Sequence, residues 1–132
     1  MVELHKQVGD VAWVVGPGAV EQGDITHLEP DVLVFPHRLS PNSTWREVDD
    51  HWLVVEVLSP SSRVYDRAIK PDAYFAIGAR EVWIIDPVGQ FAEVSTRPGR
   101  VQKVDSVIRW RVPDSDRIAP IDIGGIFARL KR

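Results

Sequence analysis

A single acidic residue, Glu56, interrupts the otherwise apolar run W-L-V-V-E-V-L at positions 52–58. A run of this length and composition is typical of a β-strand that is buried on both faces. Side chains alternate between the faces of a strand, so Val54, Glu56 and Leu58 share one face. A carboxylate buried there without a partner would be strongly destabilising. The fold must therefore provide Glu56 with a cation, a lysine, a proton or a metal ion.

The composition indicates one domain over residues 1–132, because 132 residues with 44% hydrophobic content suffice for a single core. Cysteine is absent, which excludes disulfides, thiolate catalysis and zinc sites built on cysteine. A metal ion would need oxygen or imidazole ligands. The sequence has neither an apolar run long enough for a membrane span nor the apolar core of a signal peptide. We therefore expect a cytoplasmic protein with no membrane partner.

Charge is distributed unevenly along the chain, although the net charge of −3 gives no hint of a nucleic-acid partner. Residues 1–96 carry 7 Lys and Arg against 15 Asp and Glu, whereas residues 97–132 carry 9 against 4. A basic surface that approaches phosphates, beside an acidic part that binds a cation, is one interpretation. A charged face exposed to solvent is the simpler one.

Five apolar segments rich in Val, Ile and Trp predict β-strands, and Gly, Pro and Asn clusters separate them. Beyond residue 96 we expect a hairpin of two further strands, followed by a short closing strand and a terminal helix in I-D-I-G-G-I-F-A-R-L. The five segments are 11–15, 31–35, 52–58, 82–86 and 91–95, and the hairpin strands are 100–104 and 107–112.

A helix is predicted between Ser62 and Gly78, where Gly78 supplies the left-handed residue that ends it. Pro71 predicts either a kink or a separate turn before a helix that opens at Pro71. The order of strand, helix and strand from Leu53 to Asp86 predicts a crossover between two parallel neighbouring strands.

Three residues form a candidate hydrolytic site. Asp31 opens one strand, Glu56 lies within the next, and Lys70 lies on or beside the following helix. If the two strands are adjacent, the acids lie about 5 Å apart across the pairing. A hard divalent cation such as Mg²⁺ would relieve their repulsion, and a lysine would stabilise a developing oxyanion or orient an attacking water. The set predicts hydrolysis of a phosphodiester.

An ordered set of motifs resembles the Uma-two family of the PD-(D/E)XK nuclease superfamily, over roughly residues 29–88. The motifs are P-D-V-L-V-F, then E-V-L-S-P-S-S, then D-R-A-I-K with a tyrosine four residues on, then E-V-W-I-I-D-P. The resemblance implies an α/β restriction-endonuclease-like core of mixed sheet with flanking helices and a C-terminal hairpin. It also implies that Asp31, Glu56 and Lys70 are catalytic, and that Asp31 and Glu56 bind Mg²⁺ or Mn²⁺.

Two departures from the family pattern bear on activity. The superfamily usually has its lysine two residues after the acid, a position that is Leu58 here, so the resemblance assigns this role to Lys70 on the following helix. Pro71 directly follows and could displace it. Relatives also begin with a hairpin and helix that supply another polar residue. We expect this chain to be short at that end, with Glu3 and His5 as the remaining candidates.

The leading hypothesis is a metal-dependent endonuclease that acts on nucleic acid, with DNA favoured over RNA as the substrate. A homodimer is compatible with this hypothesis. The alternative is a catalytically inactive protein of the same fold that binds nucleic acid or a protein. A third hypothesis is that another segment, or a second chain, completes the site. Simpler roles exist for single residues: Asp31 as a strand start, Lys70 as a solvated residue, Asp86 as a turn residue, and His37 and His51 as surface or loop residues.

Overall fold

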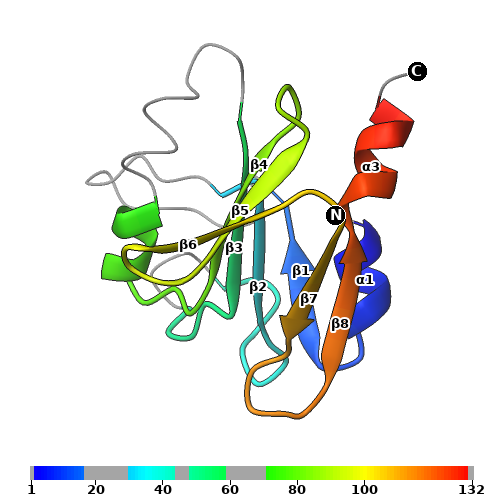
Figure 1. Ribbon diagram of the computed structural model, residues 1–132. Coiled ribbons are helices and arrows are strands. Elements are labelled where there is room, and N and C mark those ends of the chain that lie inside the picture. The colour runs from blue at the N-terminus through cyan, green and yellow to red at the C-terminus, as the bar shows by residue number, and fades with distance from the viewer. Residues whose placement is uncertain (1, 17–29, 44–47, 59–70, 131–132) are drawn as a thin grey trace.

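A computed structural model describes residues 2–16, 30–43, 48–58 and 71–130 (Figure 1). Its centre is a six-stranded sheet with strand order β1-β2-β3-β4-β5-β6, and β7 and β8 form a separate two-stranded sheet. The bounds are α1 Val2–Val8, β1 Ala12–Val15, β2 Val32–Pro36, β3 Leu53–Val57, β4 Val82–Asp86, β5 Phe91–Arg97, β6 Arg100–Val104, β7 Val107–Arg111, β8 Ile118–Asp122 and α3 Ile123–Leu130.

The central sheet is mainly antiparallel. β2 pairs antiparallel with β1 and with β3, and β5 does so with β4 and with β6. β3 and β4 pair in parallel, which confirms the crossover predicted between Leu53 and Asp86. The mixed sheet with few helices is the α+β architecture expected from the sequence. β3 therefore has a hydrogen-bonded neighbour on each side, and Glu56 is held within the interior of the sheet.

Among the residues that the structure describes, two apolar clusters form the core, one on each face of the sheet. Leu53 and Val55 pack with α1, β7, β8 and α3, whereas Val54 and Leu58 pack with Leu33, Ile84 and other residues of the opposite face. Figure 1 shows α1, β7, β8 and α3 on one side of the sheet and the helical residues 71–76 on the other. The prediction that both faces of β3 are buried is confirmed, because its first four residues are all buried.

All five apolar segments form strands, with ends that shift by one or two residues from the predicted bounds. The hairpin expected between residues 100–104 and 107–112 is wrong in its pairing. β6 pairs with β5, and β7 pairs with β8. Turn residues account for this, because Gly99 (φ +77°) and Asp114 (φ +60°) adopt left-handed conformations at the two tight connections.

Residues 71–76 are helical, and Gly78 has φ +105°, which confirms it as the left-handed residue ending this segment. Residues 59–70, which include the predicted start of the helix and Lys70, lie outside the described residues. Whether Pro71 kinks a longer helix or opens a new one therefore stays a prediction. Within the described ranges, none of the helices has the length and apolarity that a membrane span requires.

Candidate functional site

Asp31 and Glu56 are brought together by the pairing of β2 with β3. Val32 pairs with Val55, so extending this antiparallel register by one position places Asp31 opposite Glu56. The backbone N–H of Val57 donates a 2.6 Å hydrogen bond to Oδ2 of Asp31. One carboxylate oxygen of Asp31 is thus fixed to the residue that follows Glu56. The adjacency expected of the two acidic strands is present in the structure.

Glu56 is 3% exposed, and its carboxylate interacts with a residue from the helical segment on the same face of the sheet. The hydroxyl of the fully buried Tyr74 donates a hydrogen bond to Oε1 of Glu56. A hydrogen-bond donor offsets part of the cost of burying a carboxylate. The expectation that Glu56 needs a partner is therefore met in part by a phenol.

Tyr74 is a residue of this site that was not predicted from the sequence. Its spacing of four residues from Lys70 was part of the family pattern, but a tyrosine within a partly apolar helix is usually a core residue. The signal that could have identified it is the position of Glu56 on the strand. Glu56 faces the side of the sheet that the crossover segment must cover, and Tyr74 supplies a donor in that segment.

Lys70, the third predicted site residue, lies outside the described residues, and its role stays a prediction. The position that holds the lysine in most of the superfamily is filled by Leu58, which is 4% exposed and packs in the apolar cluster on the Glu56 face. Glu3 and His5 lie on α1, whose Leu4 packs in the cluster on the opposite face. The structure does not bring α1 to the Glu56 side of the sheet.

Asp86 and His51 have structural roles. Oδ1 of the buried Asp86 accepts a 2.9 Å hydrogen bond from the Gly89 N–H, so the turn role considered for Asp86 is confirmed. His51 was expected as a surface or loop residue; it lies in the connection before β3, but it is buried, being 3% exposed, and its Nε2 is 2.9 Å from the Val48 carbonyl oxygen. Burial lowers the pKa of the His51 imidazole. His37 is exposed, as expected.

The donor chemistry of the site is that of two carboxylates. Among the described residues, no group of three or more His, Cys, Asp and Glu is arranged to hold a metal ion. Two carboxylates on adjacent strands nevertheless fit Mg²⁺, because this ion keeps several water ligands and often takes only one or two from the protein. The arrangement of Asp31 and Glu56 is chemically suited to such an ion.

Comparison with known proteins confirms the resemblance seen in the sequence. Residues 9–120 match the family model Uma2, described as "Putative restriction endonuclease". The fold resembles the crystal structure of "a putative nuclease belonging to DUF820" from Anabaena variabilis, with a TM-score of 0.69 and 20% sequence identity over 98% of this chain and 76% of that chain. No curated protein matches this chain. Because the family model spans most of the sequence, the protein belongs to the Uma2 family.

Proposed function

We propose that this protein is a metal-dependent endonuclease that hydrolyses phosphodiester bonds of nucleic acid, with DNA as its substrate. The observation that carries the proposal is the β2–β3 register, which sets Asp31 opposite Glu56. Two carboxylates at neighbouring positions repel each other, so a cation between them is favourable. Membership of a family described as a restriction endonuclease supports the same activity.

Asp31 and Glu56 would hold the ion, which we expect to be Mg²⁺ or Mn²⁺, since both ions accept carboxylate oxygen ligands. When bound, the ion would supply a water of lowered pKa and neutralise charge on the scissile phosphate. The rest of the ion's coordination would come from water and from the substrate phosphate.

The protein's own groups orient the two acids. The Val57 N–H fixes the Asp31 carboxylate through Oδ2, and the Tyr74 hydroxyl fixes the Glu56 carboxylate through Oε1. Partners of this kind hold metal ligands in one orientation, which reduces the reorganisation needed during a reaction. The burial of Glu56 strengthens its electrostatic attraction to a cation, because little water screens it.

Lys70 is assigned the role of stabilising negative charge on the phosphate. The contact between Tyr74 and Glu56 supports this assignment, because it brings the segment that follows Lys70 against the Glu56 side of the sheet. An ammonium group near the two acids would offset the charge that develops on the phosphate oxygens.

The test is cleavage of plasmid and linear duplex DNA, with single-stranded DNA and RNA as further substrates, in Mg²⁺, Mn²⁺ or EDTA. We expect cleavage by the wild type with either metal, and loss of cleavage to background in Glu56→Gln. Glutamine keeps a carbonyl oxygen that accepts the Tyr74 hydrogen bond, so this variant removes charge with little change in shape. Asp116→Asn, in the exposed β7–β8 connection, is the matched control and should cleave normally.

Absence of cleavage by the wild type with both metals, or equal cleavage by Glu56→Gln, would overturn the proposal. Calorimetric titration with Mg²⁺ separates the two main hypotheses further. A nuclease should release or absorb heat that depends on Glu56, whereas a catalytically inactive binding protein should show no such heat.

A further inference from the structure

Strand β7 has one paired edge and, in the described part of the chain, one open edge. The Val112 N–H donates a 2.9 Å hydrogen bond to the Arg117 carbonyl oxygen, and in an antiparallel pair every second residue bonds to the partner strand. Val112 and the alternate residues before it therefore bond to β8. Pro120, which has no N–H, lies opposite one of the other residues, as this alternation allows. The residues whose backbone N–H and C=O groups are directed to the open edge are Val107, Arg109 and Arg111.

A hollow of about 380 Å³ lies along this open edge. It is lined by the three open-edge residues, by Ile108, and by residues that lie in the central sheet or just before β4. These sheet residues are Glu81, Val94, Thr96, Gln102 and Val104. Val94 and Val104 pack with the apolar cluster that contains Trp110 of β7, so they lie on the face of the central sheet that β7 and β8 cover. The β7–β8 layer thus leaves part of β5 and β6 uncovered, and the hollow marks this part.

The open edge is long enough to pair with a short strand. From Val107 to Arg111 it extends about 14 Å, since each of the four steps along a strand rises about 3.4 Å. A row of unpaired N–H and C=O groups is a template for a further strand, which would lie about 4.8 Å from β7 and cover the hollow. In recognition of this kind, main-chain hydrogen bonds supply affinity and alternate side chains supply specificity.

Two arginines determine which charge suits the outward side of such a strand. Arg109 and Arg111 are both exposed, on the side of β7 away from the core. Arg109 forms no ion pair with any described residue. The pair of Arg111 with Asp116, at 3.2 Å, joins two exposed groups and contributes little. Side chains of neighbouring strands that face the same side interact directly. Acidic residues at the outward positions of an added strand would therefore complement Arg109 and Arg111.

The side of the strand that faces the central sheet needs a different chemistry. Val94 and Val104 offer apolar contacts there. Glu81 also lines the hollow, and Oε2 of its carboxylate accepts a 2.6 Å hydrogen bond from Nε1 of Trp83. Glu81 would repel an acidic side chain on this inner side, whereas an apolar side chain would bury Val94 and Val104. The segment that fits the edge therefore alternates acidic and apolar residues.

We propose that the open edge of β7 binds an extended acidic segment of another protein as an added strand of the β7–β8 sheet. The acidic side chains of the segment face Arg109 and Arg111, and its alternate apolar side chains cover the hollow. A second copy of this chain fits less well, because full antiparallel overlap of two β7 strands sets their Arg109 side chains directly opposite each other. Binding at this edge requires neither a metal ion nor hydrolysis, so it is independent of the proposed endonuclease activity.

The test is binding of a fluorescein-labelled seven-residue peptide of alternating Glu and Val to the full chain, measured by fluorescence anisotropy. We expect saturable binding. N-methylation of every backbone nitrogen of the peptide should weaken it about tenfold or more, because the main-chain hydrogen bonds to β7 are lost. Replacing each Glu of the peptide by Lys should also weaken it about tenfold or more, because like charges then meet Arg109 and Arg111.

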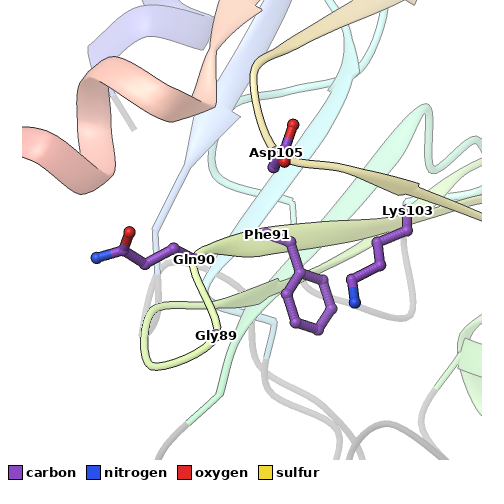
Figure 2. Close-up of a pocket in the computed structure, with 5 residues that line it drawn as sticks. All are labelled: Gly89, Gln90, Phe91, Lys103 and Asp105. Carbon is purple, nitrogen blue, oxygen red and sulfur yellow. The ribbon is translucent and has the colours of Figure 1, made fainter.

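Two substitutions at Arg109 separate its backbone from its charge. Arg109→Pro removes an N–H of the open edge that is not part of the β7–β8 ladder, and should weaken binding about tenfold or more. Arg109→Gln keeps the N–H and should weaken binding about two- to fivefold. Lys103→Gln is the matched control and should bind normally. Its pairing with Glu93, and that of Glu93 with Ile84, set Lys103 on the opposite face of the sheet. Figure 2 shows Lys103 next to Phe91, where its Nζ lies 4.0 Å from the ring centroid.

Affinity for the N-methylated peptide within twofold of that for its parent would overturn the proposal, as would equal affinity for the Lys-containing peptide, or no binding of the Glu-containing one. The peptide comparisons use the wild-type chain, so they decide the matter even if Arg109→Pro does not fold. Sedimentation equilibrium of the protein alone tests the other occupant. A dimer that a folded Arg109→Pro variant no longer forms would assign the edge to a second copy of this chain and overturn the proposal.

Discussion

The hydroxyl of Tyr74 hydrogen-bonds to Oε1 of Glu56, joining a helical segment to the interior of the sheet across 18 residues of sequence. Both residues are almost fully buried. The crossover segment between β3 and β4 thus contributes a polar group to the acid that the sequence identifies as central. In the proposed endonuclease, Tyr74 is a positioning residue for this acid.

Removing the Tyr74 hydroxyl tests this relationship. We expect Tyr74→Phe to lower the free energy of unfolding by about 1–3 kcal/mol, because a buried carboxylate loses a donor. If the endonuclease proposal holds, cleavage should also fall by about 10- to 100-fold, as for other residues that orient metal ligands. Guanidinium denaturation and Mg²⁺-dependent DNA cleavage measure the two effects. Unchanged stability and unchanged cleavage would show that the hydrogen bond is unimportant.

Two substitutions at Asp31 separate its charge from its hydrogen bond. Asp31→Asn keeps an oxygen that accepts from the Val57 N–H, so we expect unfolding within about 0.5 kcal/mol of the wild type but no cleavage. Asp31→Ala removes the acceptor as well and should lower the free energy of unfolding by about a further 0.5–1.5 kcal/mol. Denaturation curves and cleavage assays on both variants check this. Normal cleavage by Asp31→Asn would show that the carboxylate is not a metal ligand.

The ion pair between Asp10 and Arg117 predicts a pH dependence of stability. Arg117 donates to both carboxylate oxygens of Asp10, each at 2.8 Å, and this hydrogen bonding lowers the pKa of Asp10 from its usual 3.8. Because the folded pKa is the lower one, the contribution is present above about pH 4 and is lost as the pH falls through the folded value. Thermal unfolding of Asp10→Asn from pH 2 to pH 7 should therefore show a smaller loss of stability in acid.

Arg117→Gln is the partner variant for the Asp10 test. It should reduce the acid dependence in the same way, and Asp10→Asn should add little to it in the double variant, because Arg117→Gln already removes the ion pair, together with the 3.3 Å hydrogen bond from Arg117 to the Gln7 carbonyl oxygen. Additive effects of the two substitutions would mean that the pair does not act as a unit in solution.

Trp110 holds the β7–β8 sheet against the central sheet. Its ring lies edge-to-face with that of Trp83, with centroids 6.2 Å apart, and it is 1% exposed. We expect Trp110→Ala to destabilise the protein by about 3–5 kcal/mol, the usual cost of emptying such a buried position. Urea denaturation measures this. Ile118→Ala, an exposed residue on β8, is the control and should change stability by less than about 0.5 kcal/mol.

The positions of the strands could be predicted from the sequence, because apolar runs and turn residues are local signals that do not depend on tertiary packing. The β3 segment shows this well, since its apolar residues on both faces already implied a central strand, and Glu56 stood out against them. The pairing of β6 and β7 did not follow, because choosing a partner depends on turn conformation. Gly99 and Asp114 set the two hairpins, and the left-handed conformation of Asp114 carries only a weak sequence signal.

The adjacency of Asp31 and Glu56 was predicted from the sequence, but their surroundings were not. Asp31 and Glu56 could be matched because each lies at or within an apolar strand segment, and the match required only that the two strands be neighbours, which they are. Tyr74 was not assigned, because its contact with Glu56 depends on how the crossover segment packs over the sheet. The burial of His51, which was expected as a surface or loop residue, was missed for a similar reason, because it depends on the tertiary packing of residues 48–51.

Strands β3 and β6 differ in how firmly the sheet holds them. β3 is bonded to a neighbour along both edges, whereas β6, in the described part of the chain, is bonded along one. A change in β3 disturbs two ladders and the core on either side, but Gln90, Lys103 and Asp105 lie where fewer contacts depend on them. Substitutions along β6 should therefore be tolerated better than substitutions in the middle of the sheet.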